Sequence, residues 1–367
     1  HRIDLTVVGP EGPLASGIVD RFETRGLPVF GPSRAAARIE SSKAYSKDLM
    51  RHANVPTARY RTFSNQAGAE DWVREQGAPI VVKASGLAAG KGAVVCMTED
   101  EAIDAIASML GDLSFGEAGR EIVIEEFMEG EEVSVFAVCD GRDFVVLQPA
   151  QDHKRVGESD AGPNTGGMGA YSPVSIADAA LLDEARSEVI APTLAALVAD
   201  GAPFRGFLYA GLMNTVDGLK VVEFNCRFGD PEAQVVLPLM ESSLLDLLTT
   251  VANGGSVAGR VAAARTGAAV TTVVASGGYP GNYEKGKPIS MPQDLENDDL
   301  IVFHAGTRLA DGQLVTSGGR VLAVTAIAPS FAAAATASRS AAGQIEFDGA
   351  FFRSDIGWRE RKRLEAE

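Results

Sequence analysis

The stretch IVVKASGLAAGKGAVVCM, residues 80–97, decides the fold. Two runs rich in Val and Ile, residues 80–84 and 93–97, flank a glycine-rich loop at residues 86–92. Short β-branched runs bounded by glycine are typical of strands. The stretch therefore predicts a β-hairpin around a flexible loop.

The loop contains Gly86, Gly90, Lys91 and Gly92, which combine approachable backbone N–H groups with an ammonium. These groups suit phosphate oxygens. The loop is not a Walker A loop, because its glycine spacing is too short and a strand, not a helix, follows it. A plain flexible turn is the alternative.

Lys83 lies just before the loop and favours a phosphate-binding role for it, since a buried lysine needs an anionic partner. A solvated lysine on an edge strand is the alternative for this residue.

Residues on both sides extend the hairpin into a small lid. Residues 35–53 look helical, Thr98 and Glu101 have the spacing of a capping box that opens a helix, and residues 121–127 return to a strand. A hairpin with a helix and a further strand predicts a lid subdomain at about residues 60–128.

The start of the chain predicts a parallel α/β unit. Residues 3–9 and 27–30 read as strands, and residues 15–25 read as a helix ended by Gly26. Strand, helix and strand in this order indicate a parallel sheet. Because such a unit normally begins with a strand and a glycine-rich turn, we expect a further segment ahead of residue 1.

The second half of the chain predicts a hairpin, a linker and a separate α+β domain. Residues 204–225 hold two apolar runs around the turn at residues 216–218, and residues 253–264 are rich in Gly and Ala. Strands and a helix are then predicted at residues 268–275, 320–327 and 330–342.

The composition indicates a globular protein of several domains. The chain has 367 residues, 46% hydrophobic and 22% charged, with a net charge of -16. This charge argues against nucleic acid as a partner. No apolar run is long enough for a membrane span, and no signal pattern opens the chain. Its 3 cysteines are widely spaced, which argues against disulfides and structural zinc. We expect a cytoplasmic location.

Glu223 and Asn225 are candidate metal ligands at the end of a predicted strand. Alternation places their side chains on one face and Phe224 on the other. Two oxygen donors suit Mg²⁺, which commonly takes one or two protein ligands plus substrate phosphates. A hydrogen-bonded strand end is the alternative. The following RFGDPE, residues 227–232, adds a cation and two carboxylates; a solvated turn with an internal ion pair is the alternative there.

A second polar stretch predicts a binding loop. DHKR at residues 152–155 and the glycine-rich residues 162–169 lack periodicity. Lys154 and Arg155 supply local cations for a phosphorylated substrate. A hydrogen-bonding role for His153 is favoured over general-base work, because no nucleophilic Ser or Cys arrangement accompanies it.

Several strings together resemble the motifs of the phosphoribosylamine-glycine ligase (glycinamide ribonucleotide synthetase) family of the ATP-grasp superfamily. The resemblance covers residues 3–359, and its most specific strings are QDHKR and NCRFGDPE. The matching strings are KASGLAAGKGAVV, IEEFMEGEEVS, QDHKRVGESDAGPNTGGMGAYSP, GFLYAGL, VVEFNCRFGDPE, FHAGT, VTSGGRVL and FRSDIGWR.

The resemblance implies ATP-dependent coupling of glycine to 5-phosphoribosylamine through an acyl phosphate, with Mg²⁺ or Mn²⁺, in purine synthesis. We expect no obligatory protein partner and a monomer or weak dimer. The resemblance implies nucleotide contacts at Lys43, Lys83, Gly86, Gly90, Lys91, Gly92, Glu125, Glu126, Phe127, Met128 and Glu132. It implies metal ligation by Glu223 and Asn225, catalytic roles for Arg227 and Asp230, and substrate contacts at Asp152, His153, Lys154, Arg155, Asn164 and Gly166.

The resemblance also implies a domain order: the remainder of a Rossmann-like α/β domain at residues 1–36, an ATP-grasp domain at 37–252 and a C-terminal α+β domain at 253–367. Ser85 departs from the family's usual Asp, and the family's N-terminal GGREHA segment is absent from this sequence. Two alternatives stay open: another ATP-grasp ligase of the purine pathway, or a nucleotide-binding protein without ligase activity.

Overall fold

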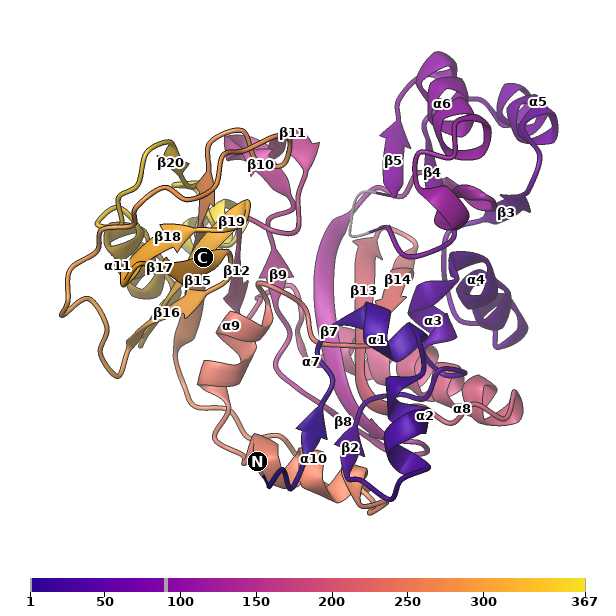
Figure 1. The fold of residues 1–367 in the computed structure, drawn as a ribbon. Helices are drawn as coiled ribbons and strands as arrows, with labels where there is room; N and C mark the ends of the chain where they lie inside the picture. The colour runs from indigo at the N-terminus through magenta and orange to yellow at the C-terminus, as the bar shows by residue number, and fades with distance from the viewer. Residues whose placement is uncertain (1, 89–91, 367) are drawn as a thin grey trace. The chain divides into compact units, whose positions relative to one another are not determined.

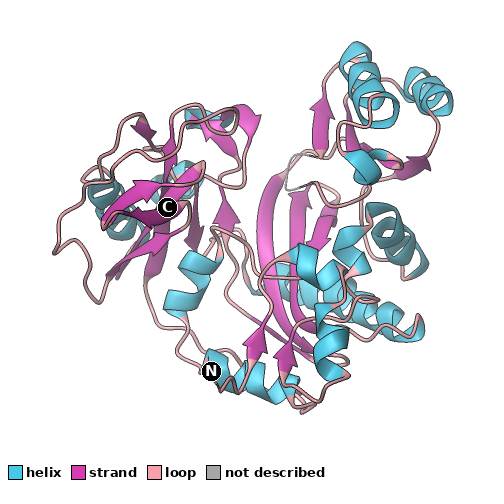
Figure 2. Ribbon diagram, viewed as in Figure 1, coloured by secondary structure: helices cyan, strands magenta, loops and turns pink. Residues whose placement is uncertain are grey.

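The computed structural model of the chain describes residues 2–88 and 92–366, in which helices and strands are mixed (Figures 1 and 2). Its contacts group the chain into two compact units. The mixed α/β and α+β class predicted from the sequence is confirmed. Unit 1 comprises His1–Leu147, Ala179–Phe228 and Ser243–Val261, and unit 2 comprises Gln148–Asp178, Gly229–Ser242 and Ala262–Glu367.

Unit 1 begins with the predicted parallel strand pair. β1 (Thr6–Val7) pairs in parallel with β2 (Val29–Phe30). The helix expected at residues 15–25 is present as α2 (Ile18–Glu23), and an additional short helix, α1 (Glu11–Ala15), precedes it. The break between the two helices falls at Gly17, which is left-handed with φ 79°. Glycine enters this conformation at little steric cost, since it has no Cβ.

Two helices replace the predicted helical stretch at residues 35–53. α3 (Arg38–Ser41) is followed by α4 (Lys43–His52). Ser42 between them is extended, and its side chain accepts a hydrogen bond from the backbone N–H of Tyr45. A serine in this geometry satisfies an unpaired donor at the start of a helix. Lys43 therefore becomes the first residue of α4.

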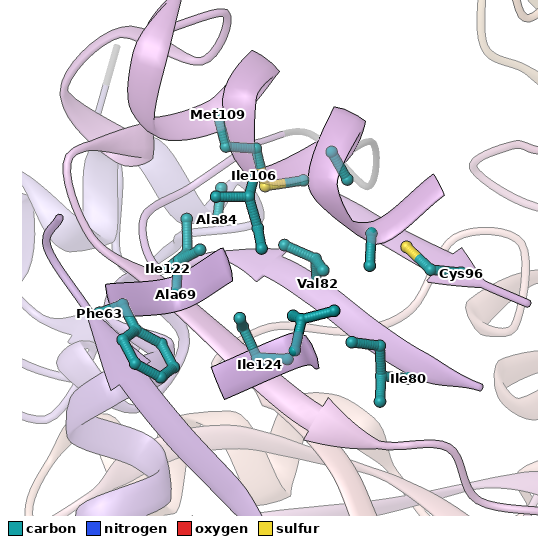
Figure 3. Close-up of a cluster of buried hydrophobic side chains, with 13 residues drawn as sticks. Phe63, Ala69, Ile80, Val82, Ala84, Cys96, Ile106, Met109, Ile122 and Ile124 are labelled. Carbon is teal, nitrogen blue, oxygen red and sulfur yellow. The ribbon is translucent and has the colours of Figure 1, made fainter. Parts of the chain in front are cut away.

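The stretch that opens at residue 80 lies in a four-stranded antiparallel sheet, as its hairpin pattern predicts. Two helices, α5 (Gln66–Gln76) and α6 (Glu99–Ile106), pack on one face of it, and α6 opens with the predicted capping box. Figure 3 shows their shared apolar core. In spatial order the strands are β3 (Tyr60–Phe63), β6 (Ile122–Glu126), β4 (Ile80–Ala84) and β5 (Ala93–Cys96).

A second antiparallel sheet forms the centre of unit 1. The hairpin predicted at residues 204–225 is confirmed. The strands, in spatial order, are β14 (Gly218–Asn225), β13 (Arg205–Thr215), β7 (Glu131–Asp140) and β8 (Phe144–Val146). The remaining helices of this unit are α7 (Ala179–Glu184), the π-helical turn Ala185–Ile190, α8 (Ala191–Ala199) and α10 (Leu244–Ala252).

β14 contains an irregularity close to its end. Gly211 pairs with Glu223, while the next residue, Leu212, pairs with Val221. Val222 is therefore an extra residue on β14, which makes this a β-bulge. Bulges leave backbone groups of one strand without a partner in the ladder and change the direction of the following side chains.

Unit 2 is built on an antiparallel sheet. The strands predicted at residues 268–275 and 320–327 and the helix at 330–342 are confirmed as β15 (Ala268–Ser276), β19 (Arg320–Ala328) and α11 (Phe331–Ala342). The sheet also holds β16 (Leu300–His304), β12 (Gly169–Ser172), β9 (Gln151–Asp152) and β20 (Ala350–Phe351).

Two small hairpins and two helices complete unit 2. They are β10 (Arg155–Gly157) with β11 (Ala161–Asn164), β17 (Thr307–Ala310) with β18 (Gln313–Thr316), α9 (Ala233–Val236) and α12 (Trp358–Ala366). Within residues 2–88 and 92–366, no helix has the length and apolar character needed to cross a membrane.

Candidate active site

A buried carboxylate with two lysines lies on the face of the β4–β6 sheet that is opposite its apolar core. Glu125 is only 2% exposed. Its Oε2 accepts hydrogen bonds from Nζ of Lys83 at 2.9 Å and makes an ion pair with Nζ of Lys47 at 3.0 Å. Its other carboxylate oxygen, Oε1, is buried without a hydrogen-bond partner among the described residues. This oxygen can therefore accept a further donor.

Helix α4 supplies two of the lysines around this carboxylate. Lys43 and Lys47 are four residues apart, so they lie on one face of the helix. Lys43 donates its backbone N–H to the carbonyl of Ser85 at 2.7 Å, and its Nζ lies 3.4 Å from the carbonyl oxygen of Gly86. We call Lys43, Lys47 and Lys83 the lysine cluster.

The bulge on β14 provides an acceptor for the third lysine. Nζ of Lys83 donates to the carbonyl of Val222 at 3.2 Å. Nζ of Lys47 donates to Oγ1 of Thr57, which in turn donates to the carbonyl of Val221. The cluster is thus held between the sheet of β3, β6, β4 and β5, helix α4 and the central sheet of unit 1.

Burial perturbs the lysines on α4. It lowers the pKa of Lys47 to about 8, although the nearby charge of Glu125 opposes this shift. Burial also lowers the pKa of Lys43, and the carboxylate of Glu223 opposes the shift most. Three ammonium groups in a region poor in water favour an anionic ligand, since each charge is costly to bury without a partner.

Glu223 and Asn225 lie at the end of β14, after the bulge, and alternation puts both on one face, as predicted. Asn225 is buried and Glu223 is half-buried. A carboxylate and an amide oxygen are suitable ligands for a hard divalent cation. Among residues 2–88 and 92–366 no group of three or more His, Cys, Asp or Glu side chains could hold a metal ion, so such a cation would need oxygens from a substrate or water.

Ser85, at the position where the family usually has Asp, has a structural role. Its Oγ accepts the backbone N–H of Ala44 at 3.1 Å, and its carbonyl accepts that of Lys43. Ser85 thus ties the end of β4 to the first turn of α4. An oxygen-bearing side chain at this position satisfies a free helix-start donor, which explains how serine is accommodated here.

The other predicted nucleotide contacts surround the end of β6. The expected strand ends at Glu126, which pairs with Arg59 at 2.6 Å, so Phe127 and Met128 follow the strand and are half-buried. Gly86 and Gly92 are described, whereas the predicted contacts at Gly90 and Lys91 lie outside the described residues. Glu132 is half-buried on β7.

Arg227 and Asp230 have ion-pair partners outside the RFGDPE segment. In unit 1, the guanidinium of Arg227 lies 3.5 Å from Glu40 and 3.6 Å from Glu11. In unit 2, Asp230 pairs with Arg320 at 3.0 Å. These partners lie in the same unit as the residue that each of them contacts.

His153 is fixed by the C-terminal FRSDIGWR string. Its Nε2 accepts the backbone N–H of Gly357 at 3.0 Å, so the neutral ring carries its proton on Nδ1. Nδ1 is buried without a partner among the described residues. Burial, together with the charge of Arg353, lowers the pKa of His153 to about 4. A neutral ring of this kind suits hydrogen bonding and not general-base work at neutral pH.

The β10–β11 hairpin carries other predicted substrate contacts. Arg155 pairs with Asn164 in the ladder and donates to the carbonyl of Gly162 at 2.8 Å. Arg353, almost fully buried, donates to the carbonyl of Arg155 and to Asp160.

The remaining predicted contacts lie beside this hairpin. Asp152 is on β9, and the carbonyl of Lys154 accepts the backbone N–H of Thr165. Gly166 donates its N–H to the hydroxyl of Tyr279, and its carbonyl accepts from Arg320. The structure therefore brings the predicted substrate residues together within unit 2.

Sequence reasoning missed four residues at these places. Lys47 had a usable signal, the four-residue spacing from Lys43 on a predicted helix. Arg320 and Arg353 lie in the matching strings VTSGGRVL and FRSDIGWR. No local pattern gave the partners of these two residues or of Glu40, because Asp230, Asp160 and Cys226 are distant in the chain.

Comparison with known proteins agrees with this arrangement. Family models match three consecutive parts of the chain: Phosphoribosylglycinamide synthetase, N domain, at residues 1–40, its ATP-grasp (A) domain at 41–233, and its C domain at 269–359. The chain belongs to the phosphoribosylglycinamide synthetase family. The family resemblance drawn from the sequence motifs is confirmed, and so is the ATP-grasp fold.

Relatives support this assignment over nearly the whole chain. The chain is 49% identical to a phosphoribosylamine–glycine ligase of Brucella melitensis, over 100% of this chain and 85% of the relative. It is 50% identical to that of Ralstonia nicotianae, over 98% and 85%. The crystal structure of the Thermotoga maritima phosphoribosylamine–glycine ligase matches with a TM-score of 0.82 and 36% identity, covering 89% of this chain and 81% of that one.

A more distant neighbour shares the fold alone. The biotin carboxylase domain of Hydrogenobacter thermophilus 2-oxoglutarate carboxylase matches with a TM-score of 0.73 at 16% identity, over 95% of this chain and 76% of that one.

Proposed function

We propose that this chain ligates glycine to 5-phosphoribosylamine at the expense of ATP, giving glycinamide ribonucleotide, ADP and phosphate in purine biosynthesis. The names of its relatives support this activity. The observation that carries the proposal is the lysine cluster, in which Lys47 and Lys83 form ion pairs with Glu125. Burial lowers the pKa of the third lysine, Lys43, and the negative charge of Glu223 opposes this shift. This arrangement suits a bound polyphosphate next to a divalent cation.

The proposed reaction has two steps. The glycine carboxylate takes the terminal phosphoryl group of ATP, which forms glycyl phosphate and releases ADP. The amine of phosphoribosylamine then attacks the acyl carbon, the bond from carbon to the phosphate oxygen breaks, and the nitrogen loses a proton. No protein nucleophile is needed, so the protein contributes positioning and charge stabilisation.

The nucleotide side of the reaction belongs to unit 1. In this proposal Lys43 and Lys83 contact phosphate oxygens, the loop at residues 86–92 covers them, and residues 125–128 meet adenine. Glu132 holds the ribose hydroxyls. Lys47 keeps the carboxylate of Glu125 in place, since the two form a buried ion pair.

Glu223 and Asn225 would hold Mg²⁺, with Mn²⁺ as the other ion that fits. When bound, such an ion neutralises negative charge on the phosphate oxygens during transfer. The donor set supports this, because both residues offer oxygen and lie on one face of β14.

The acceptor side uses the remaining predicted residues. We propose that Arg227 and Asp230 orient glycine and the acyl phosphate. The cations Lys154 and Arg155 would attract the ribose phosphate, while His153 would act as a neutral hydrogen-bond donor. The contacting residues of this group are Asp152, His153, Lys154, Arg155, Asn164 and Gly166.

An ADP-release assay tests the proposal. Glycine with phosphoribosylamine should release ADP, whereas formate or bicarbonate in place of glycine should not. Release with formate or bicarbonate alone would indicate another ATP-grasp ligase. If calorimetry shows ATP binding but saturating substrates give no product, the chain is a nucleotide-binding protein without ligase activity.

We also propose a cytoplasmic monomer or weak dimer that acts on small molecules, without nucleic acid or an obligatory protein partner. The net charge of -16 supports the exclusion of nucleic acid. Sedimentation velocity at several concentrations tests the assembly state.

A further inference from the structure

Glu40 is a buried carboxylate that the sequence motifs do not single out. It is 8% exposed and lies on α3, three residues before Lys43. Its side chain points to the segment that follows β14, more than a hundred residues away in the chain. A buried carboxylate is costly unless it is paired and hydrogen-bonded, so its partners show what it stabilises.

These partners are the two residues directly after Asn225. Oε2 of Glu40 accepts the backbone N–H of Cys226 at 2.7 Å and its thiol at 2.9 Å. Oε1 lies 3.5 Å from the guanidinium of Arg227. One side chain therefore holds both the backbone and a charged group of this segment.

The position of Cys226 makes these contacts matter for the site. Cys226 is 1% exposed, and its peptide follows the carboxyl end of Asn225. A hydrogen bond to its N–H restrains the backbone dihedrals that direct the Asn225 side chain. The ion pair likewise restrains Arg227, a long side chain that otherwise has many rotamers.

We propose that Glu40 is a positioning residue, which fixes the metal-ligand strand end at Asn225 and the guanidinium of Arg227 relative to the helix that carries Lys43. The inference rests on the proposed function. Glu40 contacts Cys226 and Arg227, so it links the element that supplies the phosphate lysine to the element that supplies the metal ligand. Small displacements of such groups reduce turnover strongly.

The test compares Glu40→Gln with a control substitution of a glutamate whose side chain accepts a backbone N–H from β14 itself. Glu184 on α7 accepts the backbone N–H of Leu219 at 3.0 Å, at the opposite end of β14. Glu184→Gln therefore changes the same kind of contact away from the metal ligands. Glu40→Asp keeps the charge but shortens the side chain by one methylene.

Glu40→Gln should lower kcat about 10- to 100-fold and raise the Mg²⁺ concentration needed for half-maximal rate, with a smaller change in KM for ATP, because Glu40 contacts Cys226 and Arg227 and acts on Lys43 only through its charge. Glu40→Asp should be intermediate. Glu184→Gln should match the wild type in kcat and Mg²⁺ dependence. A Glu40→Gln variant that loses only thermal stability, with wild-type kcat and Mg²⁺ dependence, overturns the inference.

A second measurement separates this inference from the proposed function. Mn²⁺ binding in the presence of ADP, followed by the electron paramagnetic resonance of free Mn²⁺, requires no turnover. Weaker Mn²⁺ binding in Glu40→Gln than in Glu184→Gln supports the positioning role even if the wild type releases no ADP with glycine. Equal binding in the two variants contradicts it, whatever the substrate.

Discussion

The two faces of the sheet formed by β3, β6, β4 and β5 differ in chemistry although the same strands build them. Val82 and Ile124 point into the apolar core under the helices (Figure 3). Their chain neighbours Lys83 and Glu125 point to the other face and pair with each other at 2.9 Å. Register places both on one face, since Lys83 pairs with Val123 and Glu125 with Val81.

This difference indicates that the apolar face stabilises the fold and that the charged face is suited to binding a ligand. Apolar burial contributes about 25 cal/mol per Å². A buried ion pair is weak evidence for stability, because desolvation offsets the attraction. The lowered pKa values of Lys43 and Lys47 show this cost. We therefore attribute the charged face to the proposed function rather than to stability.

The largest expected effect is on the charged face. Lys83→Met should lower kcat by about 10²- to 10³-fold, the usual loss when a charge-stabilising donor is removed. The melting temperature should fall less than for a core substitution, because Lys47 still pairs with Glu125. ADP release and thermal denaturation measure the two quantities. The control is Lys285→Met, which changes an exposed lysine of unit 2. A large loss of stability with normal turnover would reverse the roles of the two faces.

A substitution on the apolar face should lower stability and leave kcat unchanged. Ile124→Ala should lower the free energy of unfolding by about 3 kcal/mol through lost burial and a cavity, while the folded fraction keeps its kcat. Val94→Ala, on the more exposed β5, should cost less than about 0.5 kcal/mol. Urea denaturation measures both. Loss of kcat in folded Ile124→Ala would show that the core face also positions the lysines.

A smaller effect is expected where the central sheet meets the lysine cluster. Glu223→Gln should lower turnover about tenfold at limiting Mg²⁺, because an anionic ligand becomes a neutral one. Excess Mg²⁺ should recover part of the loss. Turnover is measured over a Mg²⁺ titration. Near-normal turnover at limiting Mg²⁺ would remove Glu223 from the metal site.

The last prediction concerns the pH dependence of stability at Lys47. Its pKa is about 8 in the folded chain and ordinarily 10.5. Between these values the unfolded chain binds more protons, so this group makes stability rise with pH. Burial of Lys47 lowers the free energy of unfolding by its full amount below pH 8, and this destabilisation disappears as the pH rises through 10.5.

Lys47→Met should therefore remove this rise. The unfolding free energy of the wild type, minus that of Lys47→Met, should increase from pH 8 to pH 10 without nucleotide. Denaturant titrations at several pH values measure it, with exposed Lys362→Met as the control. A flat difference would sink the argument that burial perturbs Lys47.

Much of the fold was predictable because its signals are local. The capping box at Thr98 and Glu101, the hairpin at residues 204–225 and the strands of unit 2 follow from neighbouring residues. The helix expected at residues 15–25 begins only at Ile18, because the left-handed Gly17 precedes its first turn. The domain boundaries and site roles stay predictions.

By itself, the sequence determined the family, the alternation that places Lys83 on one face of β4, and the pair Glu223 and Asn225 on one face of β14. Only the tertiary structure decided that Lys47 and Lys83 share Glu125 and that Glu40 holds Cys226. The physical reason is the distance along the chain over which each interaction acts. Periodicity and capping act within a few residues, whereas a buried charge takes its partner from whichever distant segment packing brings within hydrogen-bond reach.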